Sequence, residues 1–148
     1  MAIKDTKQLE NELREAGNMS QFLVENQENL RERTLADYLN EMLDKKKITK
    51  AEAVRRSGLE PVYAYHIFAG RKKNSSRLKA LSLAIGLGLT PPETQYLLYY
   101  AGAGQLYVRN PWDSVLWFAL EKHLTIEETN NLLTSLSLAP LPGRPEDE

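Results

Sequence analysis

Residues 48–70 constrain the fold of this chain more than any other segment, because they hold two short helical patterns separated by a glycine. Thr49 is followed three residues later by Glu52, a capping-box pattern that begins a helix. Gly58 and Gly70 stand where the two helices should end, at positions that favour left-handed backbone. The segment therefore predicts two consecutive helices joined by a tight turn.

The second of these helices has its own start signal and an apolar side. Glu60 followed by Pro61 fits an N-cap and a first helical position. Ala64 and Ile67 place an apolar stripe on this helix, and Ala53 is small enough to let the two helices cross closely. Two helices joined by a glycine-containing turn are what a DNA-binding helix-turn-helix requires.

The chain resembles the lambda-repressor-like (Xre-type) helix-turn-helix family over residues 34–89. That family shows a Gln, a small Ala, a glycine-led turn, an inward apolar pair and a Gly that closes the recognition helix. The matching residues are Lys50, Ala53, Gly58, Ala64 with Ile67, and Gly70. The resemblance implies a DNA-binding transcriptional regulator, with double-stranded DNA as its partner and with a homodimer formed through an added segment.

Two departures from the family pattern bear on base reading. Lys50 replaces the usual Gln, and a lysine suits a phosphate contact. Pro61 and Val62 align with the first residues of the recognition helix, and neither side chain can make a bidentate hydrogen bond to a base edge. The resemblance therefore supports the fold more strongly than it supports sequence-specific DNA reading.

Charge is distributed unevenly along a chain whose formal net charge is only −1. Residues 34–80 carry eleven Lys and Arg against five Asp and Glu, a net charge of +6, whereas residues 1–33 carry −2 and residues 81–148 carry −5. A basic patch confined to one domain is typical of a surface that faces phosphates. The alternative is a solvated basic surface without a partner.

The helix-turn-helix interpretation names the residues of a candidate DNA-binding surface. Residues 60–69 would enter the major groove, where His66 could bond a guanine or a phosphate and Val62 could touch a thymine methyl group. Lys50 would contact a phosphate, helped by the N-terminal dipole of its helix. The full set on this surface is Lys50, Val62, Tyr63, Tyr65, His66, Arg71, Lys72, Lys73 and Arg77.

Helical patterns recur along the whole chain, and strand patterns are scarce, so the sequence predicts an all-α fold. We expect an N-terminal helical segment (1–33), a helix-turn-helix core (34–89), a C-terminal helical-hairpin extension (90–137) and a disordered tail (138–148). The expected helices outside the 48–70 segment include 6–16, 20–28 capped by Ser20, one opened by Thr34 and Asp37, 77–85 capped by Ser75 or Ser76, and 110–122.

An internal repeat with a period of 35 residues links the core to the extension. Residues 89–98 align with residues 124–133, and six of the ten positions are identical. Leu106 and Leu141 continue the same register. Each copy predicts a helix, a Leu-Thr turn, a capping box and a second helix, as in stacked helical hairpins.

Aromatic residues gather around the junction of the two copies, in residues 106–118. Trp117 and Phe118 stand at core spacing, which favours ordinary core packing. The alternative is a dimer interface or an effector pocket, because Tyr and Trp are enriched at protein contacts. A homodimer, or another protein partner bound through this aromatic segment, stays an open expectation.

Signs of an enzyme are missing from the sequence. The chain has no Cys, and its two histidines, His66 and His123, have no carboxylate or second His at metal-ligand spacing. Neither pair of closely spaced glycines has the spacing of a phosphate loop. We therefore expect no catalysis, no cofactor and no metal. The polar N-terminus, the lack of a long apolar run and the absence of Cys favour a cytoplasmic protein without a membrane partner.

A non-enzymatic protein-interaction module is the second function that the sequence allows. Such a module would keep the helix-turn-helix fold and lose base reading. Glu60, Pro61 and Val62 favour it, whereas the net charge of +6 on residues 34–80 disfavours it.

Overall fold

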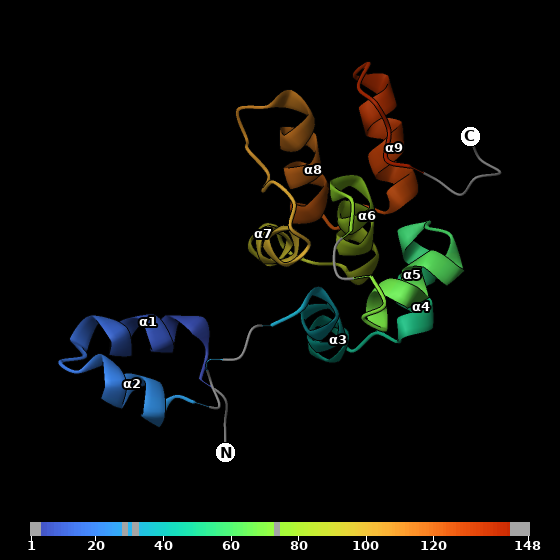
Figure 1. Ribbon diagram of the computed structural model, residues 1–148. Coiled ribbons are helices and arrows are strands. Elements are labelled where there is room, and N and C mark those ends of the chain that lie inside the picture. The colour runs from blue at the N-terminus through green and yellow to red at the C-terminus, as the bar shows by residue number, and fades with distance from the viewer. Residues whose placement is uncertain (1–3, 28–29, 31–32, 73–74, 143–148) are drawn as a thin grey trace. The chain divides into compact units, whose positions relative to one another are not determined.

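The computed structural model describes residues 4–27, 30, 33–72 and 75–142, and every regular element in those ranges is an α-helix (Figure 1). The all-α prediction is confirmed for this part of the chain. The chain divides into two compact units, residues 1–33 and 34–148. The helices are α1 (Thr6–Glu15), α2 (Met19–Glu25), α3 (Leu35–Lys46), α4 (Lys50–Ser57), α5 (Pro61–Phe68), α6 (Arg77–Leu87), α7 (Pro91–Tyr100), α8 (Pro111–Glu121) and α9 (Ile126–Ser135).

The first unit is a pair of short helices, α1 and α2. A capping box between Asp5 and Gln8 begins α1. The sequence predicted Ser20 as the cap of the next helix, but Asn18 has the extended backbone of an N-cap and accepts a hydrogen bond from the Gln21 amide. The helix therefore begins before Ser20 and ends at Glu25, because an amide oxygen two residues earlier already satisfies its first free N–H groups.

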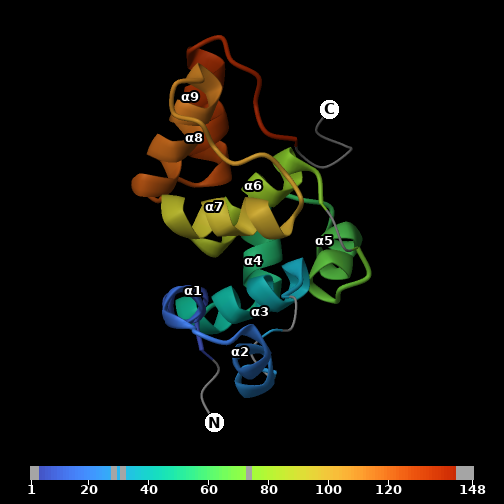
Figure 2. The ribbon, with the colours of Figure 1, turned by 60° about the vertical axis from the view of Figure 1, so that its left-hand side comes forward.

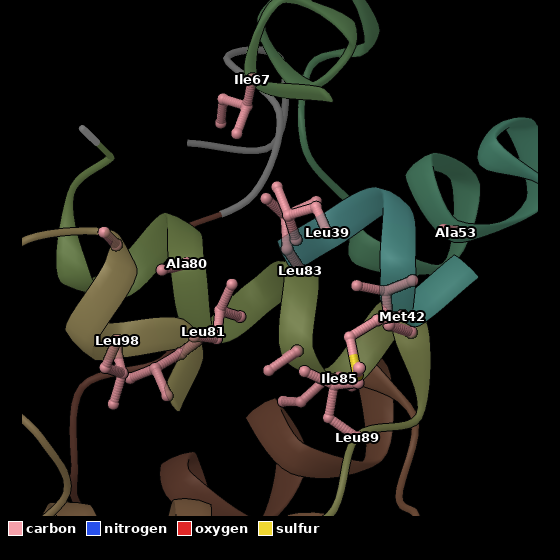
Figure 3. Close-up of a cluster of buried hydrophobic side chains, with 14 of the residues drawn as sticks. Leu39, Met42, Ala53, Ile67, Ala80, Leu81, Leu83, Ile85, Leu89 and Leu98 are labelled. Atoms are coloured by element: carbon pink, nitrogen blue, oxygen red, sulfur yellow. The ribbon is translucent and has the colours of Figure 1, made fainter. Parts of the chain in front are cut away.

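The second unit is built around α6, which packs against α3, α4, α7, α8 and α9. All residues from 80 to 87 of this helix are buried. The views in Figures 1 and 2 both place α6 at the middle of the unit. Side chains from α3 and α7 converge on it, among them Leu39, Met42 and Leu98 (Figure 3). The apolar side predicted for α3 is buried as expected, at Leu35, Tyr38, Leu39, Met42 and Leu43.

The backbones of α4 and α6 approach each other very closely at Gly86. A Cβ atom at Gly86 would lie 2.6 Å from the Ala53 carbonyl oxygen and 2.8 Å from the Ser57 nitrogen. Ala53 is fully buried. The sequence assigned the small Ala53 to a close crossing of α4 with α5, but its carbonyl faces α6, on which α4 packs far more extensively.

The two copies of the 35-residue repeat have the same local structure. The first copy holds α6 and α7, and the second holds α8 and α9. The capping boxes predicted at Thr90 with Glu93 and at Thr125 with Glu128 are both formed. α8 and α9 lie side by side in both views of the ribbon (Figures 1 and 2).

The repeat extends beyond its second helix. The Gln95 side-chain oxygen accepts a hydrogen bond of 2.7 Å from the Leu106 amide, and the Asn130 oxygen accepts one of 2.8 Å from the Leu141 amide. Leu106 and Leu141 are both buried. Residues 138–142 therefore pack on the second hairpin, where the sequence predicted a disordered tail; residues 143–148 lie outside the described part of the chain. The Pro-rich composition of this segment favoured disorder, although Leu141 stands in register with Leu106 of the first copy.

The repeat also explains two left-handed residues that are not glycine. His123 (φ 53°) and Ser137 (φ 60°) stand 35 residues after Gly88 (φ 68°) and Gly102 (φ 72°). These are the same backbone turns, made by glycine in the first copy only. The two hairpins therefore share a backbone path even where their residue types differ.

Candidate nucleic-acid interface

Thr49 caps the start of α4: its hydroxyl accepts a hydrogen bond of 3.2 Å from the Glu52 amide. The capping box predicted here is only half formed, because the Glu52 carboxylate turns to Arg55 and Arg56. Hydrogen bonds from these two guanidinium groups lower the pKa of Glu52 to about 2. Gly58 caps the end of the helix in left-handed backbone with φ 71°, and residues 58–60 lead into α5.

The start of α5 is closed by Glu60. Its carboxylate accepts hydrogen bonds from the Val62 amide (3.0 Å) and the Tyr63 amide (2.8 Å), and Pro61 has no N–H to donate. The amide groups that usually bind a phosphate at a helix N-terminus are therefore occupied or absent. Any contact of α5 with a nucleic acid would have to come from its side chains.

The end of α5 has the two hydrogen bonds of a Schellman motif. The Arg71 amide donates to the His66 carbonyl (3.0 Å), and the Gly70 amide donates to the Ile67 carbonyl (3.1 Å). The left-handed Gly70 (φ 79°) turns the chain, and the exposed Arg71 and Lys72 follow directly. This ending therefore places two cations beside the last turn of α5.

The side chains of α5 separate into a buried side and an exposed side. Ala64 and Ile67 are fully buried, as predicted. Val62 exposes 59% of its surface and Tyr65 exposes 40%. His66, expected on the outer face, is half-buried. The outward face of α5 is therefore mainly apolar.

Tyr63, which the sequence analysis placed on the DNA-binding surface, is turned toward the core instead. Its ring packs against the core, and its hydroxyl lies 3.4 Å from the Ser75 hydroxyl. The Nζ atoms of Lys72 and Lys79 lie 5.3 Å and 4.0 Å from its ring centroid. A cation over an aromatic ring is attracted to its negative face, so Tyr63 holds two lysines beside α5 rather than pointing outward itself.

Four described cations flank α5. The Nζ atom of Lys50 lies 5.9 Å from the ring centroid of Phe68, which is the last residue of α5. The others are Arg71, Lys72 and Lys79. The sequence did not include Lys79 among its site residues, and only the fold brings it to Tyr63. Lys73 was also predicted for this surface and lies outside the described residues.

Arg77, which the sequence also placed on the DNA surface, belongs to a different network. It bonds both carboxylate oxygens of Asp113 (3.1 and 2.7 Å) and the carbonyls of Gly104 (2.7 Å) and Gln105 (3.0 Å). Asp113 is buried. These bonds tie the start of α6 to the α7–α8 connection and to the first turn of α8, so Arg77 does not belong to the candidate surface.

A second candidate contact surface lies on α8. A shallow hollow of about 410 Å³ is lined by Val108, Ser114, Trp117, Phe118, Glu121 and Lys122. Phe118, expected at a core position, exposes 48% of its surface, whereas Leu83, 35 residues earlier, is buried. Trp112 does not line this hollow. Its Nε1 donates a hydrogen bond of 2.7 Å to the Ala139 carbonyl. The repeat position that is buried on α6 is thus exposed on α8.

Comparison with known proteins adds no assignment: no family model, no curated protein and no solved structure matches this chain. Within the described residues, no group of three or more His, Asp or Glu side chains could hold a metal ion. None of the described helices is both long and apolar enough to span a bilayer. The geometry around α5 and α8 therefore carries the functional argument.

Proposed function

We propose that this protein is a DNA-binding transcriptional regulator in which α4 and α5 act as a lambda-repressor-like helix-turn-helix. The main support for this proposal is the exposed outer face of α5, which is flanked by four cations: Lys50, Arg71, Lys72 and Lys79. An α-helix fits the major groove, and the cations beside it can neutralise backbone phosphates. The proposal implies a compartment that contains DNA, for which we expect the cytoplasm.

Most of the binding energy in this proposal comes from phosphate contacts, and little comes from base contacts. The flanking cations position the helix without reading sequence. Base edges are left to Val62, which can touch a thymine methyl group, to the Tyr65 hydroxyl and to His66. We therefore expect modest sequence preference and strong salt dependence.

The test is selective enrichment of genomic DNA fragments by the purified protein, repeated at two salt concentrations. The proposal expects a small set of fragments sharing a sequence to be retained at the higher salt, where non-specific binding is abolished. Uniformly weak retention of all fragments would contradict sequence-specific binding.

A protein-interaction module is the second candidate function, and the residues exposed on the first turns of α5 favour it. Glu60 places a carboxylate at the start of the helix, and Val62 and Tyr65 expose apolar surface of the kind found at protein contacts. In that case the flanking lysines would bind an acidic partner. Loss of fragment selectivity together with retention of an acidic protein would favour this function.

The hollow on α8 is the proposed contact of a homodimer. One recognition helix reads only a few base pairs, and a dimer presents two of them about 34 Å apart, or one turn of DNA. Phe118 and Val108 supply exposed apolar surface, and Glu121 and Lys122 beside them can pair across a two-fold axis. The cations flanking α5 are poor candidates for this contact because like charges would meet.

A further inference from the structure

A cleft between the end of α4 and the start of α9 combines an apolar floor with a charged rim. Its volume is about 670 Å³, which falls within the range of roughly 300–1,000 Å³ typical of small-molecule sites. The floor is formed by the apolar residues Ile85, Leu89, Ala119, Leu120, Leu124 and Ile126. The cleft is separate from the outer face of α5 and from the hollow on α8.

One rim of the cleft carries two arginines that share a single carboxylate. Arg55 and Arg56 both bond Glu52, and their side chains are 68% and 55% exposed. The Nε atom of Arg56 donates a hydrogen bond of 2.9 Å to the Glu52 carboxylate. Within the described residues, the two terminal nitrogens of Arg56 contact no carboxylate. This rim therefore keeps a net positive charge and guanidinium N–H groups that can bind an anion.

The other rim is formed by the turn between α8 and α9. His123 lines it in left-handed backbone, which is uncommon for a residue other than glycine. Glu127 also lines the cleft, but it lies in the first turn of α9, where the helix dipole favours a negative side chain. The helix dipoles suit the charges on both rims, because Arg55 and Arg56 stand in the last turn of α4. The rims differ in number: two arginines and one glutamate line the cleft, and Glu52 occupies only the Nε of Arg56.

We propose that this cleft binds a small amphipathic organic acid, whose anionic group contacts Arg55 and Arg56 while its apolar body lies on Leu124 and Ile126, the partly exposed apolar residues of the lining. Carboxylates and sulfonates both offer several acceptor oxygens to the N–H groups of a guanidinium fork. Desolvation of the apolar body against the floor supplies the rest of the affinity. The proposal does not depend on whether α5 binds DNA.

The experiment compares two fluorescent probes on the full chain. Anilinonaphthalene sulfonate joins an aromatic body to a sulfonate, and N-phenylnaphthylamine has a closely similar body without the charge. Arg56→Gln is expected to weaken sulfonate binding by about fivefold, the scale of one exposed ionic contact, and to leave amine binding unchanged. Glu127→Gln is expected to tighten sulfonate binding by about twofold, because it removes a nearby like charge.

Two control variants locate the probe. Arg14→Gln removes the same charge from α1, and Phe118→Ser alters the hollow on α8; neither should change sulfonate affinity. Circular dichroism checks that each variant keeps its helices. The proposal is overturned if no saturable sulfonate binding occurs, if Arg56→Gln and Glu127→Gln have no effect, or if Phe118→Ser abolishes binding.

Discussion

Gly86 matters because of what surrounds it rather than because of its backbone angle. It lies inside α6, where Ala would raise helix propensity by about 1 kcal/mol. A Cβ atom there would nevertheless lie 2.6 Å from the Ala53 carbonyl oxygen, and backbone atoms of α4 cannot rotate away as a side chain would.

Gly86→Ala is therefore expected to lower the free energy of unfolding by about 1–3 kcal/mol despite the better helix former. Chemical denaturation followed by circular dichroism measures this. Gly17→Ala is the matched control, since nothing lies within 4 Å of its added Cβ, and it should change stability little. Equal stability of the Gly86 variant and the wild type would mean that α4 and α6 are further apart than described.

The ion pairs of Glu93 connect two elements, the end of α3 and the start of α7. The Glu93 carboxylate contacts Lys45 (2.6 Å) and Lys46 (2.7 Å) while also capping α7 through the Thr90 amide. Burial raises the pKa of Glu93, but the hydrogen bonds from the two lysines and from Thr90 outweigh it and hold the pKa at about 2. Since the folded pKa lies below its ordinary value of 4.5, this group stabilises the fold above that pH, and the contribution disappears as the pH falls toward 2.

Glu93→Gln keeps a side chain that can cap the helix but removes both ion pairs. We expect it to cost about 2 kcal/mol at neutral pH and to make the stability less dependent on pH between 4.5 and 2. Glu128→Gln is the control, because Glu128 holds the same capping position in the second repeat and contacts only Thr125 within the described residues. If both variants lose the same stability, the ion pairs contribute nothing and the cap alone matters.

The sequence was informative about elements wherever a local signal decides the structure. Gly58, Gly70 and the Thr and Glu capping pairs mark helix ends through contacts within a few residues, so those boundaries could be predicted. Contacts between residues of distant elements could not be predicted in this way. Arg77 is one more basic residue in the sequence, and only the fold shows that Asp113 holds it. Lys79 reaches Tyr63 for the same reason.

The 35-residue repeat held more information than its ten most similar positions. The ten positions pair Gln95 with Asn130, and one position upstream Gly88 pairs with His123, so the alignment predicts both a packed Leu141 and a left-handed turn. The composition of residues 138–148 argued for disorder, and that argument was given more weight than the register of Leu141.

Across the whole molecule, the cations flanking α5 should act as one phosphate-binding surface. Lys50→Glu combined with Arg71→Glu is expected to weaken binding to every DNA sequence, because phosphates are the same in all of them. The slope of log affinity against log salt should become shallower by about 0.9 for each phosphate that the variant no longer neutralises. Fluorescence anisotropy over a salt series measures both quantities.

Lys7→Glu combined with Arg14→Glu is the matched control, since it changes the net charge equally on α1. It should leave the salt slope of DNA binding unchanged. An equal loss of affinity in both double variants would show that overall charge, rather than the surface beside α5, governs DNA binding.

The assembly of the molecule should depend on the hollow on α8. Phe118→Asp places a charge in the proposed contact and is expected to shift a dimer to a monomer in sedimentation at micromolar concentration while the helicity is kept. Tyr96→Asp is the control, because Tyr96 is an exposed aromatic residue on α7, outside the hollow. A wild-type protein that sediments as a monomer would rule out this interface. Trp112 is a poorer choice for this test because it also anchors Ala139.

The turn at Gly58 has a further consequence through its contact with the second hairpin. The Ile126 Cγ2 atom lies 3.5 Å from the position of a Cβ at Gly58, so the first residue of α9 rests against the turn that joins α4 to α5. The second hairpin therefore packs directly against the turn from which α5 starts. A shift of Ile126 toward this turn would press on the chain that joins α4 to α5 by direct contact.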